Sequence, residues 1–221
     1  MPERAREAMG PGREDPRPGG LLDYERKYWS QGVSGLAGVD EAGRGPLAGP
    51  VVAAAVILEP GVAVDGAADS KLLTRARRES VYADVLVRAA AVAVGSASVR
   101  VIDRINVLEA TALAMRRALE RLPRAPEHVV VDGLPMRSLG RQHDAVVAAD
   151  AGIHSVACAS IVAKVVRDRI MTRLALRHPG YGWERNAGYA TTDHLEALHR
   201  LGPTPHHRKL MATRQLGLDL G

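Results

Sequence analysis

Four acidic residues stand out because each follows an apolar run: Asp40, Glu41, Asp132 and Asp150. We expect the first two at the end of the first strand, Asp132 at the end of the fourth and Asp150 at the end of the fifth. Strand ends border the ligand crevice of open α/β sheets, so acids from separate strands can converge there. Converging carboxylates repel one another, and a bound divalent cation relieves the repulsion. Hard oxygen ligands favour Mg²⁺ or Mn²⁺ over Zn²⁺, and such ions can activate a water and stabilise a leaving oxygen in phosphodiester hydrolysis.

The alternative is that these acids are solvated turn residues, because acids are common where strands end. Asp132-Gly133 is an ordinary turn pair. Asp40 and Glu41 are adjacent, and neighbouring side chains on a regular strand face opposite ways, so a shared cation would require a bend in the backbone there. Gly43 and Gly45 could supply one. Spacing alone therefore leaves both interpretations open.

The elements that must position these acids follow from hydrophobic periodicity and from glycine and proline breaks. One predicted helix, 103–122, would carry Ile105, Leu108, Ala112, Met115 and Leu119 along one face. Three early strands followed by alternating helices and strands predict a mixed five-stranded sheet flanked by helices, the α/β layer architecture. The predicted strands are 35–40, 50–58, 92–101, 127–132 and 145–149, and the predicted helices are 22–30, 74–90, 103–122, 155–176 (with Ile161, Val165 and Ile170 inward) and 192–201.

Length and composition indicate one domain, because 221 residues are too few for two ordinary domains with linkers. We expect a disordered arm over 1–20, the folded domain over 21–209 and a flexible tail over 210–221. The formal net charge is +5, and since only four of the 30 basic residues are lysines, arginine dominates; arginine suits phosphate recognition. A single cysteine, no bilayer-length apolar run and no apolar signal core favour a cytoplasmic protein, with a monomer as the default.

Residues 38–50, Gly-Val-Asp-Glu-Ala-Gly-Arg-Gly-Pro-Leu-Ala-Gly-Pro, resemble the signature of ribonuclease HII, a family of RNase H-like enzymes that process RNA joined to DNA. The resemblance runs from about Leu22 to Lys209. Beyond the signature it is carried by 69–71 (Asp-Ser-Lys), 102–106 (Ile-Asp-Arg-Ile-Asn), 131–133 (Val-Asp-Gly), 159–169 (Ala-Ser-Ile-Val-Ala-Lys-Val-Val-Arg-Asp-Arg), 188–189 (Gly-Tyr) and 206–208 (His-His-Arg).

The resemblance implies an RNase H-like fold with a helical C-terminal segment, and it implies that the four acids named above form a metal centre. It also implies that Gly43-Arg44-Gly45 recognises the ribose 2′-hydroxyl mainly through backbone groups, that Tyr189 sits beside the next nucleotide and that Lys71 lies near the substrate backbone. The chain departs from the family where a lysine is frequent. Those positions hold Leu72, Ala148 and Ala187, so substrate affinity is more in doubt than the chemistry.

Other residues have simpler interpretations. The eight histidines are scattered, and His206-His207 is structural or exposed rather than a zinc site. Lys164 and Asp168 are four apart on a helix and can pair with each other. Cys158 is a small packing residue. The segment 43–49 lacks the Gly-Lys-Ser/Thr ending of a phosphate-binding P-loop.

The C-terminal residues resemble the short hexapeptide by which bacterial replication and repair proteins bind the sliding clamp. The match is carried by Gln215, Leu216, Leu218 and Leu220. An amphipathic, frayed chain end is the alternative, and it is slightly favoured because six residues match easily by chance.

The resemblance implies an endonuclease that cuts 5′ to ribonucleotides in RNA/DNA hybrids and at single ribonucleotides in duplex DNA, leaving a 3′-hydroxyl and a 5′-phosphate. The chain would thereby support ribonucleotide removal from DNA. The alternatives are an activity on long hybrids like that of ribonuclease HIII, a noncatalytic hybrid-binding protein and a sliding-clamp adaptor. The first would need an extra N-terminal domain, the second a missing acid, and the third rests on the tail alone.

Overall fold

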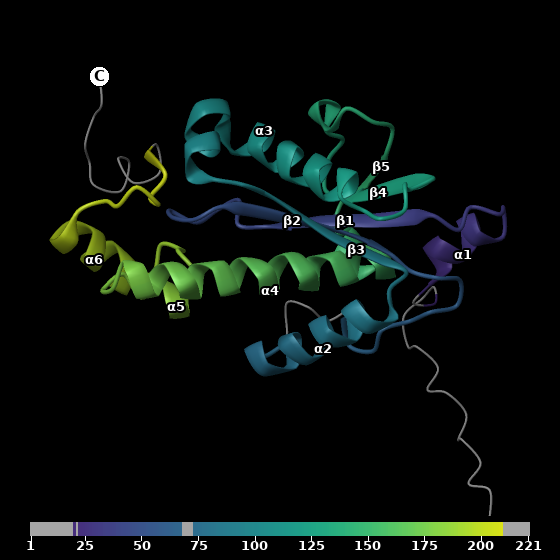
Figure 1. Ribbon diagram of the computed structural model, residues 1–221, viewed down its shortest axis with the longest axis horizontal. Coiled ribbons are helices and arrows are strands. Elements are labelled where there is room, and N and C mark those ends of the chain that lie inside the picture. Colours follow the sequence, from purple (N-terminus) through teal and green to yellow (C-terminus); the bar gives the residue numbers. More distant parts are fainter. Residues whose placement is uncertain (1–19, 21, 68–72, 210–221) are drawn as a thin grey trace, which may run out of the picture.

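The computed structural model describes residues 20, 22–67 and 73–209 (Figure 1). The expected arm, apart from Gly20, and the expected tail lie outside these ranges. The elements are α1 (Asp23–Trp29), β1 (Leu36–Ala42), β2 (Val51–Ile57), α2 (Arg75–Arg88), β3 (Ala91–Ala97), α3 (Val99–Glu120), β4 (His128–Asp132), the 3-10 turn η2 (Arg137–Leu139), β5 (Asp144–Val146), the 3-10 turn η3 (Ala149–Ala151), α4 (His154–Arg177), α5 (Trp183–Asn186) and α6 (Thr192–Leu201).

A five-stranded mixed sheet in the order β3-β2-β1-β4-β5 forms the centre of the molecule, which confirms the predicted fold class. β1 pairs with β2 and β2 with β3 antiparallel, whereas β1 with β4 and β4 with β5 are parallel. Figure 1 shows α3 over one face of the sheet and α4 over the other, with α2 outside α4. No helix of the described ranges is long and apolar enough to cross a bilayer.

Alternation along the strands sorts side chains between the two faces of the sheet. Ala37 and Val39 of β1 and Val129 and Val131 of β4 pack in the core under α3. The intervening residues therefore face α4. Gly38 is one of them, and a Cβ there would lie 2.3 Å from the backbone carbon of Ser155. Glycine thus lets the first turn of α4 approach β1 closely.

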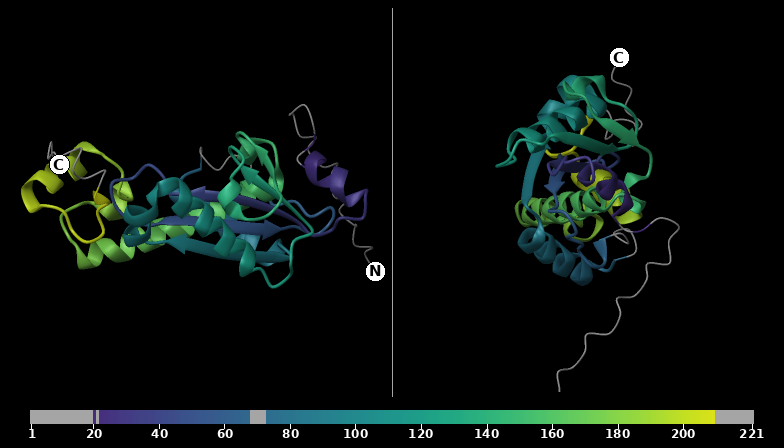
Figure 2. Two further views of the ribbon diagram at one scale, coloured as in Figure 1. Left: turned by 90° about the horizontal axis from the view of Figure 1, so that it is seen from above. Right: turned by 90° about the vertical axis from the view of Figure 1, so that its right-hand side faces the viewer.

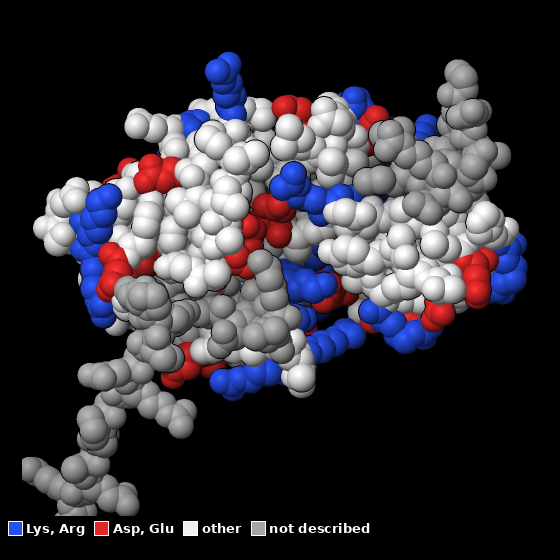
Figure 3. All heavy atoms as spheres, turned by 180° about the vertical axis from the view of Figure 1, so that it is seen from behind, with Lys and Arg blue, Asp and Glu red and all other residues white. Residues whose placement is uncertain are grey.

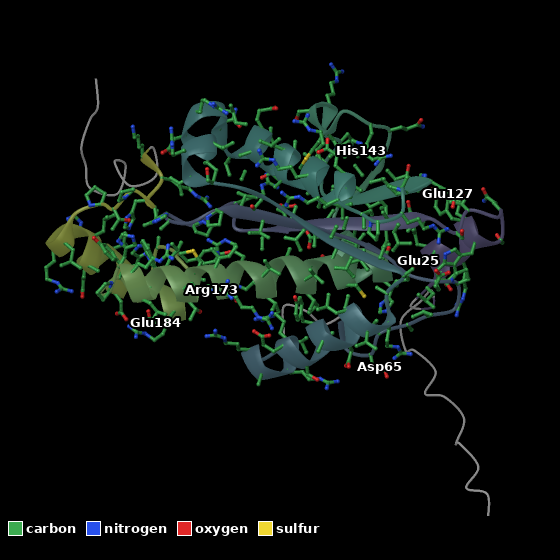
Figure 4. All side chains as sticks on the ribbon, in the orientation of Figure 1. Glu25, Asp65, Glu127, His143, Arg173 and Glu184 are labelled. Atoms are coloured by element: carbon green, nitrogen blue, oxygen red, sulfur yellow. The ribbon has the colours of Figure 1, made fainter. Side chains whose placement is uncertain are left out.

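The N-terminal helix α1 is tied to the sheet end and to α4 through polar side chains. Tyr24 and Tyr28 each donate a hydrogen bond to Asp144 Oδ2 at the start of β5, at 2.7 and 2.6 Å. The buried carboxylate of Glu25 accepts hydrogen bonds from the backbone N–H and the hydroxyl of Ser155, at 2.7 and 2.8 Å. Glu25, labelled in Figure 4, therefore caps the N-terminus of α4. Figure 2 shows α1 and α6 at opposite ends of the molecule.

The expected boundaries were wrong between 92 and 122. The third strand ends at Ala97, and α3 begins at Val99 rather than at 103 because the carbonyl of Ser98 accepts the first helical N–H bonds. Asn106 interrupts α3 with φ 67°, and its side-chain oxygen accepts the N–H groups of Leu108 and Glu109. This break shifts the helical periodicity, so Leu108 is 49% exposed instead of facing the core.

The long helix α4 was predicted to within one residue at each end. Ile161 and Val165 are buried as expected, whereas Ile170 is only half-buried and Met171 takes the inward position. Cys158 is fully buried among apolar residues, which confirms its packing role.

Candidate active site

Asp40 and Asp132 reach the same face of the sheet through the pairing of β1 with β4. Val39 pairs with Val131 in parallel register, so each acid is the next residue on its own strand. Both follow residues that face α3, so both carboxylates face α4. Asp40 is 5% exposed. The structure therefore brings together two acids that lie far apart in the sequence.

Glu41 lies on β1 without the bend that a cation shared with Asp40 was expected to require, yet its charge still acts on the Asp40 carboxylate. The strand continues to Ala42, and Glu41 stays in regular antiparallel register with Ala53 of β2. The backbone N–H of Glu41 donates to Asp40 Oδ1 at 2.6 Å, and Glu41 Oε1 accepts from Arg44 Nη1 at 3.3 Å. Within the described ranges, Glu41 Oε2 is buried without a hydrogen-bond donor.

Asp150 does not end the fifth strand as predicted. β5 ends at Val146, and Ala148 adopts a left-handed backbone with φ 57°, which takes the chain off the sheet into η3, where Asp150 is buried. The backbone N–H of Ala149 donates to Asp132 Oδ1 at 2.7 Å. This bond holds the turn that carries Asp150 against the end of β4.

Burial and mutual repulsion disfavour the charged forms of Asp40 and Glu41. The pKa of Asp40 is raised well above its ordinary value by burial and by the charges of Glu41 and Asp132, partly offset by hydrogen bonds from Ser160 and the Glu41 backbone. The pKa of Glu41 is raised by burial, which the Arg44 guanidinium partly counteracts. A bound cation would relieve this cost.

The donor set fits a hard divalent cation in its chemistry. All the acids offer carboxylate oxygens, and one buried oxygen of Glu41 still lacks a donor within the described ranges. Across those same ranges, no three His, Cys, Asp or Glu side chains stand close enough to form a closed metal cage. The oxygen donors and the repulsion between the acids thus favour a bound cation. Their side chains do not by themselves form a complete coordination cage.

The loop between β1 and β2 contains Gly43, Arg44 and Gly45, which differ in their surroundings. Gly43 is buried with φ 98°, and a Cβ there would lie 2.0 Å from Arg167 Nε. Arg44 and Gly45 are exposed, and a Cβ on Gly45 would meet nothing within 4 Å. Gly43 is therefore required by the fold, whereas Gly45 leaves space open to solvent.

Tyr189 is the exposed aromatic side chain of this region, at 43%. The Lys164 ammonium and the Arg167 guanidinium lie 5.8 and 5.7 Å from the centroid of its ring. Its backbone carbonyl accepts from His194 Nδ1 at 2.8 Å, which fixes the turn that carries it. The expected pairing of Lys164 with Asp168 is confirmed at 2.8 Å.

A pocket of about 310 Å³ opens beside Tyr189. Figure 3, which views the molecule from behind, shows acidic side chains near the middle of that face with basic side chains beside them in a hollow. The charged residues that line the pocket are Arg75, Arg78, Lys164, Arg185, Asp168 and Glu184. The excess of basic groups suits an anionic ligand.

Other predicted site residues lie outside the described ranges. These are Lys71, Leu72 and the tail residues Gln215, Leu216, Leu218 and Leu220.

Sequence reasoning missed the roles of two buried arginines but not that of His207. Arg167 and Arg208 are 0% and 1% exposed, and both bond carbonyls of the loop that contains Gly43. His207 is buried and donates from Nε2 to His194 Nε2 at 3.1 Å, so its structural interpretation is confirmed. One signal was available for Arg167, because it stands four residues after Ala163 and four before Met171 on the inward side of α4.

Comparisons with known proteins point to one family. The family model described as Ribonuclease HII matches residues 37–214. A ribonuclease HII of Ruegeria pomeroyi is 54% identical over 194 residues, covering 86% of this chain and 82% of the relative. One of Thermosynechococcus vestitus is 51% identical over 191 residues, covering 85% and 88%.

Solved structures give the same result for the fold. The ribonuclease H2 of Pyrococcus horikoshii matches with a TM-score of 0.69 and 28% identity, over 81% of this chain and 96% of that one. The ribonuclease HII in a PCNA complex from Archaeoglobus fulgidus matches with a TM-score of 0.68 and 27% identity, over 80% and 94%. Bst-RNase HIII, solved with Mn²⁺, matches with a TM-score of 0.65 at 22% identity, over 83% and 69%, a likeness of fold alone.

Proposed function

The chain belongs to the ribonuclease HII family and is an endonucleolytic ribonuclease H, and on this premise we propose the bond that it cuts. It hydrolyses the phosphodiester 5′ to a ribonucleotide, in RNA/DNA hybrids and at single ribonucleotides in duplex DNA. The products carry a 3′-hydroxyl and a 5′-phosphate. This activity supports ribonucleotide removal from DNA, and we place it in the cytoplasm with the chromosome.

The observation that carries the proposal is the juxtaposition of Asp40 and Asp132. Two neighbouring parallel strands each deliver one carboxylate to the same face at the same level. Burial and repulsion raise the pKa of Asp40, so the folded chain holds negative charge at a cost that a ligand can recover. A noncatalytic binding protein would not need this costly arrangement.

Asp40, Glu41, Asp132 and Asp150 are the residues that would hold Mg²⁺ or Mn²⁺. When bound, the ion would supply a water of lowered pKa and positive charge to offset the negative charge developing on the leaving oxygen. The chain positions its ligands through main-chain bonds, from Glu41 N–H to Asp40 and from Ala149 N–H to Asp132. Asp40 and Asp132 are thereby each fixed by one oxygen.

Selectivity for ribose is assigned to Gly43-Arg44-Gly45 and Tyr189. The open space beside Gly45 permits a sugar to approach the backbone closely. Tyr189 offers an exposed ring on which a sugar or base can stack. The basic pocket next to Tyr189 suits the phosphates that continue along the strand, and Lys71 is proposed as a further backbone contact.

A second partner is proposed for the C-terminal tail. A related ribonuclease HII has been solved in a PCNA complex, and Gln215, Leu216, Leu218 and Leu220 match a clamp-binding hexapeptide. Deleting residues 215–221 should abolish binding to the bacterial sliding clamp in surface plasmon resonance while cleavage of a short duplex is unchanged. Unaltered clamp affinity would remove this part of the proposal.

A cleavage assay tests the main proposal. The substrates are a DNA duplex with one ribonucleotide, an all-DNA duplex and a long RNA/DNA hybrid, each with Mg²⁺, with Mn²⁺ and with EDTA. We expect a single cut 5′ to the ribonucleotide, none in the all-DNA duplex and none with EDTA. Cleavage that persists in EDTA, or binding of the first duplex without any cut, would overturn the proposal.

A further inference from the structure

Two buried arginines lie behind the loop that connects β1 and β2. Arg167 comes from α4 and Arg208 from the segment after α6, and they are 0% and 1% exposed. Neither forms an ion pair with a carboxylate of the described ranges. A buried charge without a counter-ion is expensive unless hydrogen bonds satisfy it.

Main-chain carbonyls satisfy both guanidinium groups. Arg208 contacts three carbonyl oxygens of the loop between β1 and β2. Arg167 contacts two further carbonyl oxygens of the same loop and one in the turn before Tyr189. The bonds run from Arg208 to Gly43 O (2.5 Å), Arg44 O (2.7 Å) and Gly49 O (2.9 and 3.2 Å), and from Arg167 to Pro50 O (3.0 Å), Ala187 O (3.0 Å) and Ala48 O (3.2 Å).

These bonds determine which way the peptide groups of the loop face. No peptide bond described here is cis, and in a trans peptide the C=O and the following N–H point in opposite directions. The carbonyls of Gly43 and Arg44 are drawn inward to Arg208. The N–H groups of Arg44 and Gly45 must therefore point away from Arg208, on exposed residues.

The two outward N–H groups have no backbone or side-chain acceptor among the described residues. Space is open beside Gly45, where a Cβ would meet no atom within 4 Å. Two adjacent donors that face open space suit an acceptor oxygen of a ligand. Arg167 also bonds the carbonyl of Ala187, two residues before Tyr189, so Arg167 links this loop to the turn that carries that ring.

We propose that Arg167 and Arg208 are positioning residues for ribose recognition, which aim the N–H groups of Arg44 and Gly45 at an acceptor oxygen of the ribonucleotide. The inference rests on the proposed function. Arginine is needed rather than any cation, because its planar group donates several bonds in fixed directions and lysine cannot hold three carbonyls in this geometry. The arginines do not touch the substrate themselves.

Binding measured without divalent metal tests the inference separately from catalysis. Fluorescence anisotropy in EDTA gives the Kd for a duplex with one ribonucleotide and for the matching all-DNA duplex. The discrimination is the Kd for the all-DNA duplex divided by the Kd for the duplex with one ribonucleotide. In Arg208→Lys, which keeps the charge, we expect this ratio to fall about tenfold, or to one if the wild-type ratio is smaller than that. A tenfold change corresponds to the loss of one to two hydrogen bonds. Arg167→Lys should act in the same direction.

Arg173→Met is the matched control for charge. Arg173 is an exposed arginine of the same helix α4, labelled in Figure 4. Its loss should weaken binding to both duplexes by similar factors and leave their ratio unchanged, because phosphate attraction is blind to the sugar. Circular dichroism at the assay temperature establishes that each variant is folded.

Three outcomes are distinguishable. A folded Arg208→Lys with wild-type discrimination overturns the inference and leaves the proposed function intact. Wild-type protein that neither discriminates nor cuts overturns the proposed function and the inference with it. If Arg208→Lys does not fold, the Gly45 amide resonance of Arg167→Lys is followed by NMR during titration with the ribonucleotide duplex. A shift equal to that of the wild type then overturns the inference.

Discussion

Two regions bury charged side chains: the acids Asp40 and Glu41 on β1, and the arginines Arg167 and Arg208 behind the next loop. They differ in how well hydrogen bonds satisfy these charges. Asp40 is 5% exposed and Arg208 is 1% exposed. Each guanidinium bonds three carbonyls, whereas Glu41 keeps a buried oxygen that receives no donor within the described ranges. The difference teaches that burial alone does not identify a functional charge. A satisfied buried charge organises backbone, and one held at a cost is available to a ligand.

Removing one acid should have the largest effect on activity. In Asp132→Asn we expect cleavage of the single-ribonucleotide duplex to fall roughly 10³-fold or more, beyond the 10 to 100-fold typical of outer-shell partners of a metal ligand. Substrate binding in EDTA should largely survive, because the amide oxygen can still accept from Ala149 N–H. Single-turnover kinetics with Mg²⁺ measure the loss. Normal turnover would place Asp132 outside the site.

Gly43→Ala should disturb the contact between the loop and the buried Arg167, and thereby destabilise the fold. The added methyl would lie 2.0 Å from Arg167 Nε at a φ of 98°, so we expect a loss of about 2–5 kcal/mol in the free energy of unfolding. Urea denaturation measures it. Gly45→Ala is the control, because its methyl meets no atom within 4 Å. Equal free energies of unfolding for the two variants would mean that the Arg167 side chain can move aside at little cost.

Neutralising Asp40 should stabilise the protein without metal. The pKa of Asp40 is raised, so the folded state holds its proton to higher pH than the unfolded state does. Stability therefore falls as pH rises through this window, and Asp40→Asn removes the fall. We expect the Tm of the variant in EDTA at pH 7 to exceed that of wild type by about 2–4 °C. A lower Tm would show that the carboxylate is not strained.

Around His207 in the C-terminal segment, stability should instead fall as the pH is lowered, and this is the smallest of the expected effects. Burial first, and then the nearby histidines 194, 178 and 206, lower the pKa of His207 to about 4. The unfolded chain takes up this proton at about pH 6.5, so stability falls as pH drops from 6.5 to about 4. His207→Gln should flatten the Tm profile in that window, whereas an unchanged slope would contradict the assignment.

Much of the sheet and of the candidate site could be predicted from the sequence. Apolar runs before Asp40 and Asp132 placed both acids near strand ends, and the periodicity of α4 located it to within one residue. Asp150 and Leu108 were misplaced for local reasons. Ala148 adopts a left-handed backbone that alanine rarely takes, and Asn106 interrupts α3 by accepting N–H bonds from the turn that follows it.

The sequence by itself determined which charged groups the chain possesses and which strands and helices carry them, because side-chain periodicity is a local property. Only the tertiary structure decided that Asp40 and Asp132 share one face and that Arg208 bonds the carbonyl of Gly43, 165 residues away. The physical reason is that every backbone carbonyl is the same acceptor whatever its side chain. The amino-acid sequence therefore does not predict which carbonyls will accept hydrogen bonds from a buried arginine.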